Sequence, residues 1–301
     1  MRFVQTWQRQ FVRLMIAPVP SPVFWRPFMF SCLAGSSTGL GGALVIFLDT
    51  SSKSPHIAWC LGFSAGVMMT ISFFDLLIPP VYKAVTSFQP FLSLFFCLFW
   101  FLLGVFTEMG LSKVLPDESE LGESLLPFAL NRTSTTSTTS TTSITSTTNK
   151  RRFRLGILLS VTLALHNFPE GLAVAASNLA DDQLGLLMTV AIAVHNIPEG
   201  LCVAVPIYSS TGSVYQATKL AFLSGLTEPI GALAALFLFS GVDPTWHGMM
   251  LQYTLVFVGG VMISVSLREL IPEAIKSGHS KAMKQGLVGG ALVMGCTMLV
   301  V

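Results

Sequence analysis

The chain has 301 residues, of which 52% are hydrophobic and only 11% are charged, and its mean hydropathy is +0.69. Soluble domains usually carry about 25% charged residues, so this composition excludes a water-soluble enzyme and a disordered chain. The formal net charge of +2 is too small for a phosphate-binding surface, which excludes nucleic acid as a partner. The five cysteines form no CxxC pair and predict neither disulfides nor a thiolate zinc site.

Charged residues are scarce enough to mark the ends of membrane spans. Three charge-free gaps occupy 27–48, 54–74 and 84–107. About 20 apolar residues cross a bilayer as a helix, and the backbone must satisfy its hydrogen bonds within each span. Five further apolar stretches lie near 156–178, 185–207, 218–241, 249–272 and 283–301. The sequence therefore predicts an all-α, multi-pass integral membrane protein with eight transmembrane helices in a lipid bilayer.

These spans divide the chain into five segments. They are a basic N-terminal tail at 1–28, helices 1–3 at 29–110, a Thr/Ser-rich loop at 111–155, helices 4–5 at 156–207 and helices 6–8 at 208–301. The loop contains a low-complexity Thr/Ser tract that cannot build a core, so we expect it to be disordered. The tail is expected to be an interfacial helix or poorly ordered, and a targeting signal is the alternative.

The distribution of lysine and arginine predicts the orientation. If the N-terminus lies outside, the inside connections hold 11 of these residues and the outside ones hold 5. Positive charge favours the cytoplasmic side, so both termini are predicted to be non-cytoplasmic and the 111–155 loop cytoplasmic. The sequence does not distinguish a plasma membrane from an organelle membrane.

Internal repeats connect several spans. The decapeptide that begins at His166 recurs from His195 onward, with eight of ten positions identical. Weaker similarities link spans 1 and 6 at an offset of 190, as in Gly35 and Gly225, and spans 2 and 7 at an offset of 194. A three-plus-two-plus-three order reverses direction between repeats, and inverted repeats are typical of transporters. Chance is the alternative for the two weaker similarities.

The repeated motif H-N-x-P-E-G places metal-binding groups on one helix face. His166 and Glu170 are four positions apart and Asn167 and Glu170 are three apart, so the carboxylate lies between the other two groups and can bridge two ions. Pro169 lacks an N–H and frees a backbone carbonyl, and Gly171 is expected to loosen the helix further.

Span 5 repeats this construction with His195, Asn196 and Glu199, and the short connection at 179–184 makes the two spans antiparallel. Span 6 adds Glu228 to an otherwise uncharged stretch. Three carboxylates inside a bilayer are costly unless cations offset their charge. Imidazole and carboxylate groups suit Zn²⁺ and also Fe²⁺, Mn²⁺ or Co²⁺. Because so many polar groups share the membrane core, a metal site is favoured over a purely structural role.

Three further residues are weaker metal-site candidates. Met69 could offer a thioether, although packing is its more ordinary role. Asp75 and Glu269 lie near span ends and could gather ions at an entrance or exit, with pairing to Arg268 or simple exposure as the alternatives. Glu108 is interpreted as an interface charge, and the small residues of span 1 around Thr38 as close helix packing.

The paired HNFPEG and HNIPEG motifs, together with the SGLTEP stretch that begins at Ser224, resemble the ZIP (Zrt/Irt-like) family of divalent-metal transporters, in its ZupT-type branch. The similarity is strongest over about 155–275 and weaker over spans 1–3. It implies eight helices, a homodimer, a binuclear metal centre and alternating access that moves metal into the cytoplasm. Unlike many members of the family, this chain has no histidine in the 111–155 loop.

The resemblance also implies the ligands of each ion. It assigns the first ion to His166, Glu170 and Glu199, with His195 nearby. It assigns the second to Asn167, Asn196, Glu199 and Glu228, with Glu170 able to bridge.

A divalent-cation transporter, with zinc first and Fe²⁺, Mn²⁺, Co²⁺ or Cd²⁺ as further substrates, is thus the predicted function. A metal-binding membrane sensor or scaffold is the first alternative, although no folded output domain is evident in the sequence. An intramembrane metallohydrolase is the second, and it would need a motif such as HExxH, whereas Asn follows both His166 and His195. We therefore expect no enzymatic activity.

Overall fold

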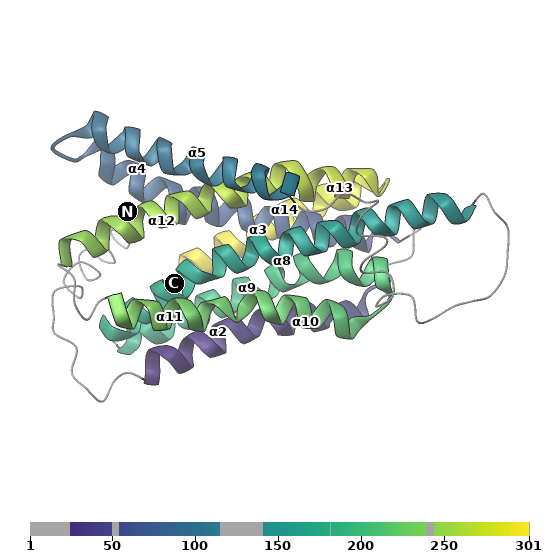
Figure 1. Ribbon diagram of the computed structural model, residues 1–301, viewed down its shortest axis with the longest axis horizontal. Coiled ribbons are helices and arrows are strands. Elements are labelled where there is room, and N and C mark those ends of the chain that lie inside the picture. The colour runs from purple at the N-terminus through teal and green to yellow at the C-terminus, as the bar shows by residue number, and fades with distance from the viewer. Residues whose placement is uncertain (1–24, 50–53, 115–140, 181, 239–243, 301) are drawn as a thin grey trace.

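The computed structural model describes residues 25–49, 54–114, 141–180, 182–238 and 244–300, and these are almost entirely helical (Figure 1). In chain order the elements are α2 (Trp25–Ala43), η1 (Leu44–Phe47), α3 (His56–Ile71), η2 (Ser72–Leu77), α4 (Ile78–Val85), α5 (Pro90–Val114), α8 (Thr141–Ala180), α9 (Asp182–Thr211), α10 (Val214–Gly225), α11 (Thr227–Leu238), α12 (Pro244–Val265), η3 (Ser266–Leu270), α13 (Ile271–Lys276) and α14 (Ser280–Val300).

Eight helical segments within these ranges are long and apolar enough to cross a membrane, which confirms the predicted number. The expected loop at 111–155 is shorter at both ends, because α5 continues to Val114 and α8 already begins at Thr141. Helix formation there requires only local backbone hydrogen bonds, which a Thr/Ser-rich composition weakens without forbidding. The remainder of the loop, at 115–140, and residues 1–24 of the tail lie outside the described residues.

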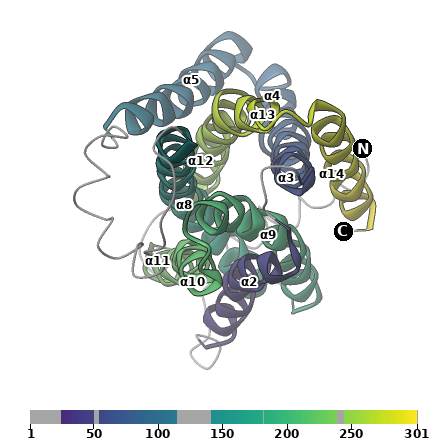
Figure 2. The ribbon, with the colours of Figure 1, turned by 90° about the vertical axis from the view of Figure 1, so that its right-hand side faces the viewer.

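The helices form two groups, which lie on opposite sides of the bundle in the view along it and meet where α8 adjoins α12 (Figure 2). We call α2, α8, α9 and the pair α10–α11 the four-helix unit, because these elements make four membrane spans. We call α3–α4, α5, α12–α13 and α14 the scaffold group, in which α3 packs on α14 and α12 packs on α5. The two groups meet along a boundary where α8 faces α12 and α9 faces α3.

Short π-helical segments interrupt spans 2 and 7 at corresponding places. The segment η2 begins at Ser72 and η3 begins at Ser266, which are related by the offset of 194 that the weak sequence similarity predicts. Each segment ends shortly before a proline, Pro79 in α4 and Pro272 in α13. Proline cannot donate a backbone hydrogen bond to the preceding turn, so a wider turn forms before it.

The offset of 194 between spans 2 and 7 also relates two helix contacts in the scaffold group. A Cβ on Gly290 would overlap the carbonyl of Phe63, and a Cβ on Gly104 would overlap the carbonyl of Phe257. Phe257 follows Phe63 by the offset of 194, and Gly290 and Gly104 lie on the two flanking helices α14 and α5. The repeated contact argues against chance similarity and supports the predicted three-plus-two-plus-three inverted-repeat architecture.

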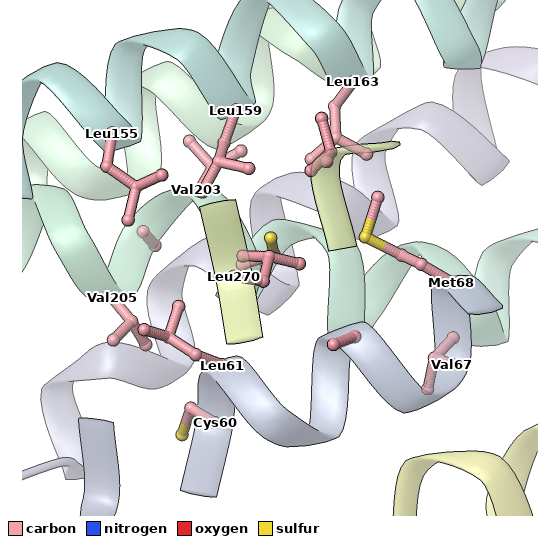
Figure 3. Packing of buried hydrophobic residues seen from close by; sticks show 14 of the residues in the cluster. Cys60, Leu61, Val67, Met68, Leu155, Leu159, Leu163, Val203, Val205 and Leu270 are labelled. Carbon is pink, nitrogen blue, oxygen red and sulfur yellow. The ribbon is translucent and has the colours of Figure 1, made fainter. Parts of the chain in front are cut away.

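Large apolar side chains fill the boundary between the two groups (Figure 3). Leu155, Leu159 and Leu163 recur at every fourth position along α8 and therefore share one face. Leu61 and Met68 of α3 belong to the same buried cluster. Polar contacts are few here among the described residues, so the boundary is held mainly by packing.

Candidate metal centre

Helices α8 and α9 carry the two copies of the repeated motif and pack against each other inside the four-helix unit. Both run without interruption through their motif prolines, Pro169 and Pro198. The expectation that Gly171 loosens α8 is therefore wrong. A Cβ at Gly171 would overlap the backbone of Glu228, so this glycine is needed for the close approach of α11.

The two helices bring imidazole and carboxylate groups into direct contact. The Nε2 atom of His166 lies 3.0 Å from Oε1 of Glu170 and 3.2 Å from Oε1 of Glu199. The Nε2 atom of His195 lies 2.8 Å from the same Oε1 of Glu170. One ligand atom each from His166, Glu170 and Glu199 fall within 4.8 Å of one another. The spacing predicted from sequence thus gives a compact cluster shared by two helices.

The cluster is buried and lacks enough hydrogen-bond donors for its carboxylates. Glu199 is fully buried: its Oε1 atom has only the 3.2 Å contact with His166, and its Oε2 atom has no hydrogen-bond partner among the described residues. The second oxygen of Glu170 is likewise unpartnered. A buried carboxylate without compensation is strongly unfavourable. Tetrahedral zinc with bonds of about 2.0–2.2 Å needs ligand atoms about 3.3 Å apart, close to the distances around His166.

The two asparagines are held by backbone carbonyls of neighbouring helices. The amide nitrogen of Asn167 donates to the carbonyl of Ser224 at 3.3 Å, and that of Asn196 donates to the carbonyl of Ala34 at 3.0 Å. Asn196 also donates to the carboxylate of Glu228. The Oδ1 atoms of both asparagines and Oε2 of Glu228 are buried without a partner among the described residues. Each amide therefore leaves its oxygen free to accept a cation.

The weaker candidates lie apart from this cluster. Met69 is partly buried in α3 and has no described polar contact. Asp75 is exposed in η2, although it lies within electrostatic range of His195. Glu269 accepts a hydrogen bond from Ser112 at 2.9 Å, which places it in the scaffold group. Among the described contacts, none joins Met69, Asp75 or Glu269 to the metal centre, and Asp75 is only within electrostatic range of it.

The interpretation of Glu108 as an interface charge is wrong. Its residue is 1% exposed, it accepts a hydrogen bond from Ser264, and its carboxylate lies 3.6 Å from the guanidinium of Arg268. The hydroxyl and the guanidinium compensate for the burial of this charge. Arg268 accordingly pairs with Glu108 and not with Asp75 or Glu269.

Sequence reasoning missed the groups that position the asparagines. The carbonyls of Ala34 and Ser224 have no side-chain signature, although the offset of 190 relates them. It also missed Ser64 of α3, whose hydroxyl donates to the carbonyl of Pro198 at 2.9 Å. That bond crosses the boundary and joins α9 directly to the scaffold group.

The fold and the site together define an integral membrane protein with a buried cluster of histidines and carboxylates between two antiparallel spans. Residues 117–301 match the family described as "ZIP Zinc transporter". The chain is 35% identical over 277 residues to "Zinc transporter ZupT" of Chlorobium luteolum, covering 92% of this chain and 98% of that protein. It is 36% identical over 283 residues to the protein of the same name from Corynebacterium efficiens, covering 90% and 96%.

The relative from Streptococcus mutans, also named "Zinc transporter ZupT", is 33% identical over 273 residues, covering 90% of this chain and 96% of that protein. The chain therefore belongs to the ZIP zinc transporter family. Membership of this family supports the transport of divalent metal ions as the function of the chain, and it favours a transporter over an enzyme.

Proposed function

We propose that the chain moves zinc, and also Fe²⁺, Mn²⁺, Co²⁺ and Cd²⁺, through a binuclear centre in the middle of the four-helix unit. His166, Glu170 and Glu199 hold the first ion, with His195 beside it. The second ion is held by Asn167, Asn196, Glu199 and Glu228, and Glu170 can bridge the two. The observation that carries the proposal is the buried contact of His166 with two carboxylates from different helices.

Unpaired ligand atoms support a second ion. The three buried carboxylates carry −3 when ionised, which one divalent ion leaves at −1 and two leave at +1, so the free oxygen atoms and not the charge favour two ions. The free oxygens of Asn167, Asn196 and Glu228 supply ligands that the first ion does not use. These are oxygen ligands without thiolate, which suits several divalent metals and permits release.

Alternating access is the proposed cycle, with the four-helix unit sliding against the scaffold group. Its support is the apolar boundary, which large side chains fill and few of the described hydrogen bonds cross. A surface held by packing can shift between discrete arrangements with little loss of hydrogen bonding. The polar ligands remain inside the moving unit throughout.

Zinc uptake by purified protein in sealed vesicles tests the site. Glu199→Ala removes the carboxylate shared by both proposed ions, and we expect uptake to fall to background. Cys202→Ala is the matched control, because Cys202 is buried one turn further along α9 and has no metal-binding place in the proposal. We expect its uptake to equal that of the unchanged protein. Uptake by Glu199→Ala at the unchanged rate would contradict the binuclear assignment.

The same vesicles separate the alternative functions. Zinc binding without flux in the unchanged protein would favour a sensor or scaffold. Competition by Fe²⁺, Mn²⁺, Co²⁺ or Cd²⁺ is expected, and uptake of zinc with no competition would contradict mixed selectivity. The homodimer remains a prediction from the family, for which the mass of the purified protein in detergent is the direct measurement.

Direction depends on orientation, which cysteine labelling in intact cells can determine. Gln89 lies in the connection between α4 and α5, and Lys281 lies at the start of α14; both are exposed. With both termini outside, a membrane-impermeant maleimide should label Gln89→Cys and not Lys281→Cys, once the labelling of native cysteines in the unchanged protein has been subtracted. The opposite pattern would reverse the predicted orientation in the plasma membrane. Labelling of neither would place the protein in an organelle membrane.

A further inference from the structure

The four-helix unit has an internal two-fold relation that extends to individual atoms. Gly35 of α2 and Gly225 of α10 are related by the offset of 190, and a Cβ on either one would overlap the carbonyl of the other. A Cβ on Gly171 would overlap the carbonyl of Glu228. A Cβ on Gly200, the counterpart of Gly171 in the second motif, would overlap the carbonyl of Thr38. Thr38 therefore occupies in α2 the place that Glu228 occupies in α11.

The side chains of these two residues leave their helices in the same relation. A Cβ placed on Gly35 would lie 3.4 Å from the Cβ of Glu228. A Cβ placed on Gly225 would lie 3.0 Å from the Cβ of Thr38. The Glu228 side chain reaches Asn196, and the two-fold relation pairs the position of Thr38 with Asn167, whose Oδ1 atom is also buried without a partner among the described residues.

The hydroxyl of Thr38 has no partner among the described residues, although the residue is completely buried. A helical threonine usually donates to the carbonyl three or four positions earlier. The carbonyl four positions earlier belongs to Ala34, which already accepts from Ser37 at 2.6 Å and from Asn196 at 3.0 Å. With that carbonyl occupied by other donors, the Thr38 hydroxyl is left without the usual helical bond.

The carbonyl of Ser224, which the offset of 190 relates to that of Ala34, is also occupied by two side-chain donors. The carbonyl of Ser224 accepts from Thr227 at 2.8 Å and from Asn167 at 3.3 Å. The residue four positions after Ser224, equivalent to Thr38, is Glu228, whose carboxylate accepts a hydrogen bond from Asn196. Where one half of the centre has a charged carboxylate, the other half thus has a neutral hydroxyl.

We propose that Thr38 is a further residue of the metal centre, where its hydroxyl acts as a weak neutral ligand. This inference rests on the proposed function. The unequal pair of Thr38 and Glu228 makes one end of the centre bind a cation less tightly than the other. The weaker end allows release, and it also influences which metals are accepted, because neutral hydroxyl and amide oxygens suit harder cations.

Two substitutions of similar size test the hydroxyl. Thr38→Val removes it and keeps the shape, whereas Thr38→Ser keeps it and removes a methyl group. We expect Thr38→Val to weaken zinc binding about tenfold, measured by competition with a fluorescent chelator. We expect its KM for uptake to rise and its selectivity between Zn²⁺ and Mn²⁺ to change, and Thr38→Ser to restore both. Ser31→Ala is the control, since Ser31 is a buried, unpartnered hydroxyl on α2 two turns away.

Thr38→Glu completes the symmetry by adding a second carboxylate. We expect tighter zinc binding, by about tenfold or more, and slower uptake because release is delayed. If Thr38→Val cannot be purified, Thr38→Ala and Thr38→Ser can be compared instead, because both lose the methyl group of threonine and only serine keeps the hydroxyl.

Binding, KM and selectivity that are unchanged in Thr38→Val and equal to those of Ser31→Ala would overturn the inference. Loss of uptake in Glu199→Ala alongside such a result would leave the proposed function standing and remove only the role of Thr38. Retained uptake in Glu199→Ala would remove the proposed function itself.

Discussion

Helices α8 and α9 have two contrasting sides. Toward α2 and α11 they approach so closely that backbone meets backbone at glycine, and on this side Asn167 and Asn196 donate to backbone carbonyls of α10 and α2. Toward α3 and α12 they present large apolar side chains instead. Among the described glycines, each one whose Cβ would overlap a neighbour makes its contact inside the four-helix unit or inside the scaffold group. None of them makes that contact across the boundary.

This difference indicates which helix contacts in the molecule are rigid and which can shift. Backbone contacts at glycine fix two helices at a single distance, because the atoms in contact are backbone atoms and no side chain between them can rearrange. Apolar side chains can instead repack in new rotamers at a small cost. The ligand positions are thus set inside a rigid unit, while the boundary is the place where movement is easiest.

The largest effect on zinc uptake is expected from breaking the close backbone packing on the glycine side. Gly171→Ala places a Cβ on the backbone of Glu228, so α8 and α11 must separate and both ligand sets lose their geometry. We expect a loss of about 1–3 kcal/mol or more of stability and near-complete loss of zinc uptake.

Thermal unfolding in detergent and vesicle uptake measure the two effects of Gly171→Ala. Gly110→Ala is the control, because a Cβ there would meet nothing within 4 Å. Equal behaviour of the two variants would show that the glycine side is not rigid.

An intermediate effect is expected from the apolar side. Leu159 of α8 is completely buried in the boundary, and Leu159→Ala leaves a cavity worth about 2–5 kcal/mol. We expect a lower unfolding temperature with zinc affinity nearly unchanged, because Leu159 lies two turns before His166, about 10 Å away along the helix. Leu98→Ala, at an exposed position of α5, should leave the unfolding temperature nearly unchanged. A much weaker zinc affinity in Leu159→Ala would show that packing at the boundary also holds the ligands in place.

The smallest effect concerns the ion pairs at one end of the boundary. Glu273 of α13 pairs with Arg151 at 3.0 Å and with Arg152 at 3.7 Å, which ties α8 to the scaffold group. Glu273→Gln should lower stability by about 1 kcal/mol or less, because both arginines retain some exposure. We expect uptake to become about two- to threefold faster with zinc affinity unchanged, if the proposed sliding breaks this tie.

Arg26→Gln provides the comparison for Glu273→Gln. Arg26 pairs with Asp182 inside the four-helix unit, so that pair does not cross the boundary. Its loss should leave the uptake rate unaltered. A matching change of rate in both variants would show that surface charge, and not the boundary, controls the rate.

The sequence predicted much of the centre because its parts are local. His166 and Glu170 lie on one helix turn, so their spacing alone predicts their contact, and the repeat at His195 predicts the second copy. The contact of His166 with Glu199 followed from the antiparallel connection. Glu108 could not be interpreted in this way, because Ser264 and Arg268 are far away in the chain and only tertiary packing brings them to it.

The sequence by itself determined the membrane class, the number of spans, the repeated motif and the family resemblance. These depend on composition, on charge-free length and on spacing within one helix, all of which are local quantities. The tertiary structure alone decided which helices group together, that Gly171 serves a close contact, and that Thr38 corresponds to Glu228. Such properties depend on the distances between helices, which are set by side-chain volume and backbone approach over the whole fold.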